Sequence, residues 1–98
     1  MASEDDIAHA LCRQLHLPRA DFQLQAVDME TVRLLPERSA RDRVCAPLWR
    51  DGSTLYLAMA DPLDIATINE IEASFRVNAA PMVATATEVR AFLDRAFG

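Results

Sequence analysis

The chain has 98 residues, of which 51% are hydrophobic and 26% charged, and its net charge is −5. These values fit one globular domain over residues 1–98 and exclude an intrinsically disordered chain. The acidic balance argues against nucleic acid as a partner, because affinity for nucleic acid depends on neutralising phosphates. No apolar run reaches the roughly 18 residues that cross a bilayer, and the acidic start does not resemble a signal peptide. We therefore expect no membrane insertion and a cytoplasmic location.

The first predicted element is an amphipathic helix over residues 4–16. Ser3, followed three residues later by Asp6, is a variant of the capping box that starts helices. Ile7, Leu11 and Leu15 then recur at i, i+4 and i+8, which places them in one apolar stripe. Pro18 ends this segment.

Two shorter helices and a β-hairpin follow. Asp28 is suited to cap a helix over about 29–35, and residues 36–43 open with proline, which favours a first helical turn. The apolar runs at 44–49 and 54–59 read as antiparallel strands, because Asp-Gly between them is a strong hairpin signal. Pro47 indicates that the first strand is an edge strand or carries a bulge.

The stretch "LAMADPLDIATINEI" (57–71) predicts a sharp change from strand to helix. Pro62 fits the first position of a helix, Asp61 fits its N-cap, and Asp64 adds negative charge to the first turn. The predicted helix covers about 62–74, with an apolar face of Ile65, Ile68, Ile71 and Phe75. A carboxylate pair at this spacing is also compatible with a metal or acid–base site, but capping explains it fully.

The C-terminal region predicts a third strand at 76–84 and a last helix at 86–97. Thr85 and Glu88 form a capping box, and the apolar positions from Val89 onward follow helical spacing. The fold class is therefore α+β: a three-stranded sheet, made of a hairpin and one further strand, with four to five helices in the order α-α-(α)-β-β-α-β-α. Residues 1–43 form a helical part and 44–98 a ββαβα part of one domain.

Motifs for catalysis are absent from the sequence. A phosphate-binding loop needs glycines before a helix, and the two glycines are Gly52, in a turn, and Gly98, at the end. His9, Cys12 and His16 share one edge of the first helix, and a zinc site would need a fourth ligand such as Cys45. The alternative is a half-buried cysteine between two surface histidines. We expect a protein that is not an enzyme and has no catalytic, metal or cofactor site.

One stretch of this acidic chain is basic. "RSARDRVCAPLWR" (38–50) contains four arginines and one aspartate, and guanidinium groups bind carboxylates and phosphates well. It is either a docking face for an acidic partner or a solvated loop and strand edge. The residues predicted to dock a partner, including one on the first helix, are Arg13, Arg38, Arg41, Arg43, Trp49 and Arg50.

These segments together resemble a known module. The matching stretches are "LHLP" (15–18), the run from "VRLLPERSARDR" to "AMADPLDIATINEI" (32–71), and "APMVATATEVRAFLDRAFG" (80–98). The chain resembles the N-terminal domain of the type II secretion ATPase, general secretory pathway protein E, which type IV pilus assembly ATPases share. Members of that family usually carry glycine between the central helix and the last strand, where this chain has Arg76.

The resemblance implies a non-catalytic protein-interaction and regulatory domain. It implies that the domain docks a secretion or pilus ATPase onto a platform protein at the inner face of the bacterial inner membrane. The alternative is a nucleotide-sensing or stand-alone signalling module. A subset of the family binds cyclic di-GMP through an upstream motif rich in arginine, glycine and leucine, and this chain has no glycine before Gly52. We therefore expect a protein partner and do not expect cyclic di-GMP.

Overall fold

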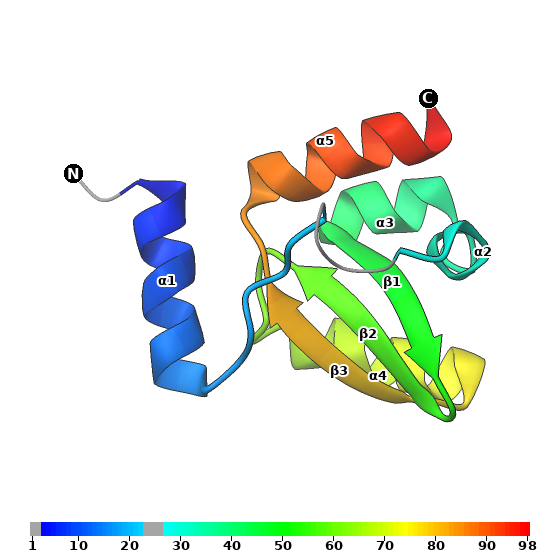
Figure 1. Ribbon diagram of the computed structural model, residues 1–98. Coiled ribbons are helices and arrows are strands. Elements are labelled where there is room, and N and C mark those ends of the chain that lie inside the picture. The colour runs from blue at the N-terminus through cyan, green and yellow to red at the C-terminus, as the bar shows by residue number, and fades with distance from the viewer. Residues whose placement is uncertain (1–2, 23–26) are drawn as a thin grey trace.

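The computed structural model describes residues 3–22 and 27–98, and it confirms the α+β class. Figure 1 shows α4 behind the sheet, α3 and α5 side by side at its upper end, and α1 beside β3. In the described ranges, no helix is long and apolar enough to cross a membrane. The elements are α1 (Glu4–Leu15), α2 (Met29–Val32), α3 (Glu37–Arg43), β1 (Cys45–Asp51), β2 (Thr54–Met59), α4 (Ile65–Phe75), β3 (Asn78–Val83) and α5 (Ala86–Phe97).

The sheet is mixed and has the order β1-β2-β3. β1 and β2 are antiparallel, with Asp51 opposite Thr54 across a two-residue loop in which Gly52 has φ 60°. This confirms the predicted hairpin. β3 runs parallel to β2, and α4 makes the connection that a parallel pair requires. β1 is an edge strand, and its register shifts between Pro47 and Trp49, as the proline indicated.

A short segment after α1 pairs with β3 at the other edge of the sheet, through an isolated parallel bridge between Arg19 and Val83. The amide of Ala20 donates to the carbonyl of Val83 at 2.8 Å, and the amide of Val83 donates to the carbonyl of Pro18 at 2.9 Å. No strand pattern in the sequence predicts this pairing. It fixes Arg19, which lies between the two bonded residues, beside the end of β3.

Both predicted capping boxes are present. The Ser3 hydroxyl accepts a hydrogen bond from the amide of Asp6, and the Thr85 hydroxyl accepts one from the amide of Glu88. In each helix the third residue's carboxylate accepts a bond from the cap's own amide in return. These local patterns explain why α1 and α5 begin where the sequence predicts.

The predicted start of the central helix was wrong by three residues. The N-cap is Asp64 and not Asp61, and α4 begins at Ile65. Asp64 accepts from both the amide and the hydroxyl of Thr67, at 3.2 and 2.6 Å. Asp61 accepts from the amide of Leu63, so Pro62 lies in a turn before the helix and is buried there. Asp61 and Asp64 are both suitable N-caps, and Asp64 takes this position because it also accepts a hydrogen bond from the Thr67 hydroxyl.

Three of the described helices end at residues with left-handed backbone: His16 after α1, Val44 after α3 and Arg76 after α4. Arg76 has φ 54° and caps α4, and Val44 has φ 51° and caps α3. Glycine adopts this conformation without strain, whereas other residues pay about 1–2 kcal/mol. Arg76 therefore occupies a backbone conformation for which glycine is suited. The second helix is also shorter than predicted, since it ends at Val32.

One hydrophobic core joins both parts of the chain. Its members from the first part include Ala20, Val32 and Ala40, and these pack with residues of the sheet, α4 and α5. In the sheet, Leu48, Leu55 and Leu57 are completely buried. The core thus lies between the sheet and the helices that cover it, and α1 contributes little to it.

Candidate functional site

A groove of about 460 Å³ runs between the segment that follows α1 and the outer side of α5. We call it the α5 groove. This volume is within the usual range for small-molecule sites. It combines guanidinium, carboxylate and aromatic groups, and its lining residues are Arg19, Ala20, Asp21, Phe22, Glu88, Ala91 and Arg95.

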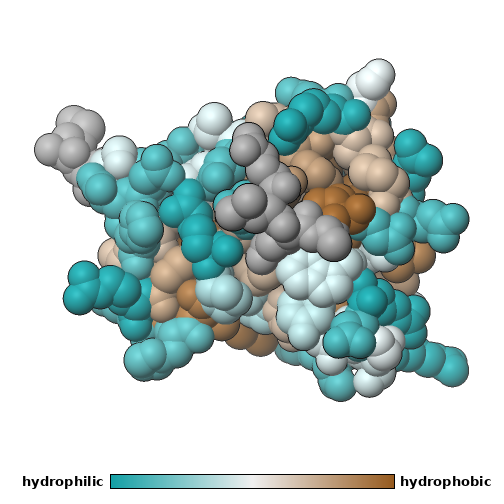
Figure 2. Space-filling view, in the orientation of Figure 1, coloured by the Kyte–Doolittle hydropathy of each residue, from teal (hydrophilic) through white to brown (hydrophobic). Residues whose placement is uncertain are grey.

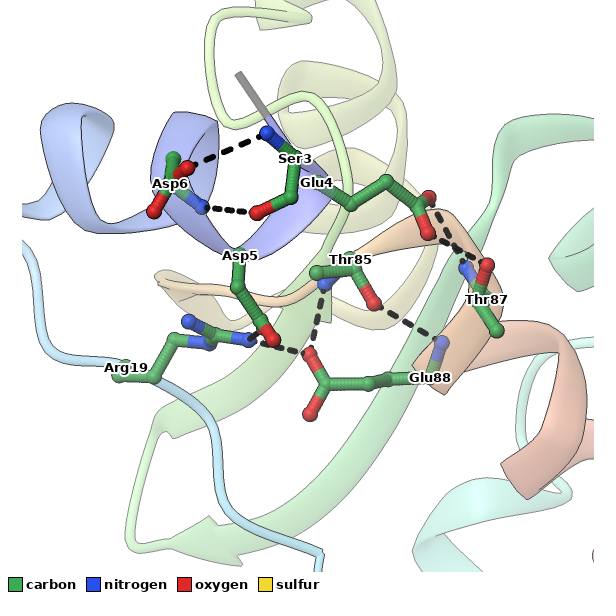
Figure 3. A network of polar contacts seen from close by, with 8 residues as sticks. All are labelled: Ser3, Glu4, Asp5, Asp6, Arg19, Thr85, Thr87 and Glu88. Carbon is green, nitrogen blue, oxygen red and sulfur yellow. Dashed lines mark hydrogen bonds and ion pairs between the residues drawn. The ribbon is translucent and has the colours of Figure 1, made fainter. Parts of the chain in front are cut away.

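Arg19 is the central cation of this region. Its Nη2 lies 2.9 Å from an Asp5 carboxylate oxygen and 2.6 Å from a Glu88 carboxylate oxygen. Its Nε is buried and makes no hydrogen bond within the described part of the chain. Figure 3 shows the guanidinium between α1 and the start of α5. Arg19 therefore links both helices to one wall of the groove.

A second link joins α1 to α5 close by. The Glu4 carboxylate accepts a hydrogen bond from the Thr87 hydroxyl at 2.6 Å and a longer one from the Thr87 amide at 3.4 Å (Figure 3). A carboxylate at a helix N-terminus is favoured by the helix dipole. The contacts that fasten the first turn of α1 to α5 are therefore polar and sensitive to charge.

Glu88 lines the groove, and its surroundings shift the pKa of its carboxylate. Its partial burial alone would raise its pKa, but hydrogen bonds from the Thr85 amide and from Arg19 hold the pKa below the ordinary value. Glu88 thus stays ionised at neutral pH. Arg95 lies on the same helix, is exposed, and makes no ion pair with any described residue. Among the described residues, the groove thus offers a fixed anion, Glu88, and a cation without an ion pair, Arg95.

The structure separates the residues that the sequence marked for docking. Arg13 lies on α1, Arg38, Arg41 and Arg43 lie on α3, and Trp49 and Arg50 lie near the hairpin turn, so in Figure 1 they occupy three separate places. Arg13 and Arg38 are exposed. These residues do not share one continuous face.

Arg41 and Arg43 are engaged in ion pairs within the chain. Arg41 lies 2.8 Å from both Glu37 and Asp94, which ties α3 to α5. Arg43 pairs with Glu70 and donates to the Thr67 hydroxyl at 2.9 Å, which ties α3 to α4. Part of the basic stretch therefore serves to hold helices together.

Trp49 and Arg50 lie at the end of the hairpin. The Trp49 ring stacks on Tyr56, with centroids 4.7 Å apart, and is half-buried. The Arg50 Nε donates to the carbonyl of Gly52 at 2.9 Å, which closes the turn. Both side chains therefore have a structural partner, and each is still partly open to solvent.

Neither cysteine is placed for metal binding. Within residues 3–22 and 27–98 no group of three or more His, Cys, Asp or Glu side chains is arranged to hold an ion. Cys45 is completely buried, and burial raises the pKa of its thiol to about 11. A thiol in that state is not a ready thiolate ligand or nucleophile. Cys12 is half-buried on α1.

Sequence reasoning missed the α5 groove. Its two walls come from segments almost 70 residues apart, and only the pairing of Pro18–Ala20 with β3 brings them together. Arg19 and Arg95 each lie alone in the sequence, with no pattern around them. The capping box of Thr85 and Glu88 was the one local pattern recognised in this region, and the start of a helix accounts for it fully.

Comparison with solved structures gives one fold throughout. The structure of MshE with cdg, cyclic di-GMP, superposes with a TM-score of 0.83 at 31% identity, over 95% of this chain and 68% of that one. The N-terminal domain of XpsE superposes with a TM-score of 0.81 at 24% identity, over 96% of this chain and 66% of that one. The second likeness shows the fold alone.

The MshE structure corrects one expectation. We considered cyclic di-GMP unlikely because an upstream motif is absent from the sequence, and that expectation was wrong: a relative with the same fold over 95% of this chain is solved with the nucleotide. The absence of one motif does not argue strongly against nucleotide binding, because arginine, carboxylate and aromatic groups recognise base edges and phosphates in many arrangements.

Sequence comparison gives the same relationship. The type IV pilus assembly ATPase PilB of Myxococcus xanthus (strain DK1622) is 24% identical over 92 residues, which are 94% of this chain and 16% of PilB. The chain thus spans about a sixth of that relative. The sequence model of the MshEN domain matches residues 15–98. The chain therefore belongs to the MshEN domain family, and in sequence it is similar to part of the type IV pilus assembly ATPase PilB.

Proposed function

We propose that the chain is a non-catalytic nucleotide-sensing domain of the secretion and pilus ATPase kind, acting in the cytoplasm, and that its ligand is cyclic di-GMP. One observation carries the proposal: MshE, solved with that nucleotide, matches this chain at a TM-score of 0.83 and 31% identity. In such a role the domain would report the nucleotide to a motor domain by changing how it contacts that domain.

We propose the α5 groove as the place where the nucleotide binds. The exposed Arg95 suits a phosphate or the O6 and N7 edge of guanine, both of which accept hydrogen bonds. The ionised Glu88 suits the N–H groups of the guanine Watson–Crick edge. Phe22, which stacks on Phe92 at 4.8 Å, supplies an apolar wall. The chemistry of the groove therefore supports a guanine nucleotide.

Thermal unfolding with and without cyclic di-GMP tests the function. A ligand at 100 times its dissociation constant stabilises the folded state by about 2.7 kcal/mol. For a domain of this size that raises Tm by roughly 10–20 °C. Cyclic di-AMP and GTP serve as controls for base and for ring. An unchanged Tm at millimolar cyclic di-GMP would rule out the proposed function.

Two variants test whether the α5 groove is the binding site, separately from whether the nucleotide binds at all. Arg95→Ala should weaken binding roughly tenfold, since it removes the unpaired cation of the groove. Arg90→Ala is the matched control, because Arg90 is exposed on the same helix and does not line the groove. Binding that is equally strong in both variants would retain the function and reject the α5 groove as its site.

A second candidate function is docking of an ATPase to an inner-membrane platform protein. The observation that favours it is the pair of Leu34, which is 41% exposed in the turn between α2 and α3, and Arg38, which is exposed near the start of α3; we call these two residues the α2–α3 patch. Arginine beside apolar groups is typical of interface centres. Arg41 and Arg43 are less suitable test positions, because reversing their charge would also break the ion pairs that hold α3.

The docking proposal is tested by capture of a platform protein on the immobilised domain. Arg38→Glu should weaken capture at least fivefold and leave Tm within about 2 °C, because Arg38 is exposed and makes no ion pair or side-chain hydrogen bond with the described residues. Arg90→Glu controls for the change in net charge. Equal capture by both variants would remove the α2–α3 patch from consideration.

A further inference from the structure

A second apolar hollow, separate from the α5 groove, lies beneath α1. We call it the α1 pocket. Ile7 and Leu11 of α1 form one side, and three alanines, Ala60, Ala84 and Ala86, form the other. The alanines come from the ends of β2 and β3 and from the first position of α5. The pocket has a volume of about 160 Å³.

The apolar stripe of α1 is only partly used in the fold. In the described part of the helix only Ala8 is buried, and Ile7 remains 53% exposed. Close to Ala60 along the chain, Leu63 and Ile65 are 58% and 57% exposed. Figure 2 shows further hydrophobic surface between the lower, C-terminal half of α1 and the sheet, with hydrophilic groups around it. Among these residues Ile7 lines the hollow, and an apolar side chain left exposed beside a hollow is typical of a binding site.

The size of the pocket matches a single large side chain. A protein cavity of about 150 Å³ holds a benzene-sized group. The small side chains of the three alanines allow another backbone to approach closely, and Ile7 and Leu11 provide contacts on the other side. One leucine or phenylalanine of a partner therefore fits as an anchor.

The charges around the pocket select the partner. Glu4 lines the pocket, Asp6 lies in the same helical turn, and Asp61 follows Ala60 directly and is exposed. None of the described residues that line it is basic. Phosphate groups and anionic lipid would be repelled. A second copy of this chain is also a poor occupant, because its net charge is −5.

We propose that the α1 pocket docks an amphipathic helix of a partner protein that carries lysine or arginine beside a leucine or phenylalanine anchor. The anchor fills the space between α1 and the three alanines, and the basic groups face Glu4 and Asp61. Amphipathic helices bind apolar grooves in this manner, with anchors at i, i+3 or i+4, and i+7. This site adjoins the proposed nucleotide groove, since Thr85 of the pocket is hydrogen-bonded to Glu88 of the groove, but different residues line it and the proposal does not depend on nucleotide binding.

The test uses three labelled 18-residue helical peptides and fluorescence anisotropy. The first has a leucine stripe and lysines, the second the same stripe with glutamates, and the third the lysines with the stripe broken by serines. The lysine–leucine peptide should bind at least tenfold more tightly than either other peptide, and more weakly as salt rises. Equal affinity for the acidic peptide, or no binding of the basic one, would overturn the proposal.

Variants of the domain test whether the peptide binds at the α1 pocket. Ala86→Leu fills the pocket and should weaken binding at least tenfold, whereas Ala73→Leu adds the same group to the exposed face of α4 and should not. If Ala86→Leu fails to fold, Ile7→Ser removes an anchor contact from an exposed position and should weaken binding at least threefold. Unchanged affinity in the folded pocket variant, or self-association of the wild-type chain in sedimentation experiments, contradicts the assignment.

Discussion

α1 and α5 are alike in length and capping, but they differ in how much of their apolar surface is buried. Both have 12 residues and a complete capping box, and both have apolar residues at helical spacing. Yet α5 buries Val89, Phe92 and Leu93, whereas α1 buries only Ala8. The pattern that makes a helix amphipathic does not decide how much of its stripe the rest of the protein covers. The uncovered stripe is where we expect partners.

Substitution of one leucine in each helix should give the largest contrast. Leu93→Ala removes a fully buried side chain and should cost about 2–5 kcal/mol in the free energy of unfolding. Leu11→Ala, in a half-buried position of α1, should cost about 1 kcal/mol or less. Urea unfolding followed by circular dichroism measures both values. Similar costs would show that α1 belongs to the cooperative core.

Removal of each cap should separate global from local stability. Thr85→Ala should lower the free energy of unfolding by about 1 kcal/mol, because it frees the amide of Glu88 at the start of a core helix. Ser3→Ala should leave global unfolding almost unchanged and speed amide hydrogen exchange within α1 alone. If Ser3→Ala lowers global stability as much as Thr85→Ala does, the contrast between the helices fails.

A smaller effect of opposite sign is expected at the end of α4. Arg76→Gly should stabilise the domain by about 0.5–1 kcal/mol, because it relieves a left-handed backbone at φ 54°. Arg33→Gly is the matched control, since Arg33 caps α2 with φ −81° and gains nothing from glycine. Chemical denaturation of both variants checks the difference, and destabilisation by Arg76→Gly would contradict the strain argument.

The smallest effect concerns acid pH. The pKa of Glu88 in the folded state lies below its ordinary value of 4.5, so its contribution to stability is present above about pH 4.5 and is lost as pH falls through the folded pKa. Glu88→Gln should therefore flatten the loss of stability below pH 4.5. Unfolding measured from pH 3 to 7 tests this, and parallel profiles of the two proteins would exclude Glu88 as a source.

The parts of the fold that were predictable from the sequence depend on neighbours in the chain. The capping residues Ser3, Asp28 and Thr85, the Gly52 turn and the bulge at Pro47 are such features. The start of α4 was missed because Asp61 and Asp64 are equally good caps, and only the bonds to Thr67 favour the second.

The candidate sites depend on distant neighbours and were not predictable in this way. Arg41 finds Asp94, and Arg19 finds Glu88, only after the chain has folded. The arginine stretch therefore looked like a free surface in the sequence although half of it is paired. The α5 groove and the α1 pocket each join segments that no local pattern connects, so neither could be inferred before the fold was known.

A titration of the ¹⁵N-labelled domain with cyclic di-GMP, followed by NMR, tests the central claim most directly. The account predicts saturable shifts at the amides of Ala20 to Phe22 and of Glu88 to Arg95, with α4 and the hairpin unchanged. Saturable shifts elsewhere would move the nucleotide to another site. The absence of any saturable shift would contradict nucleotide sensing and leave this MshEN domain with protein partners alone.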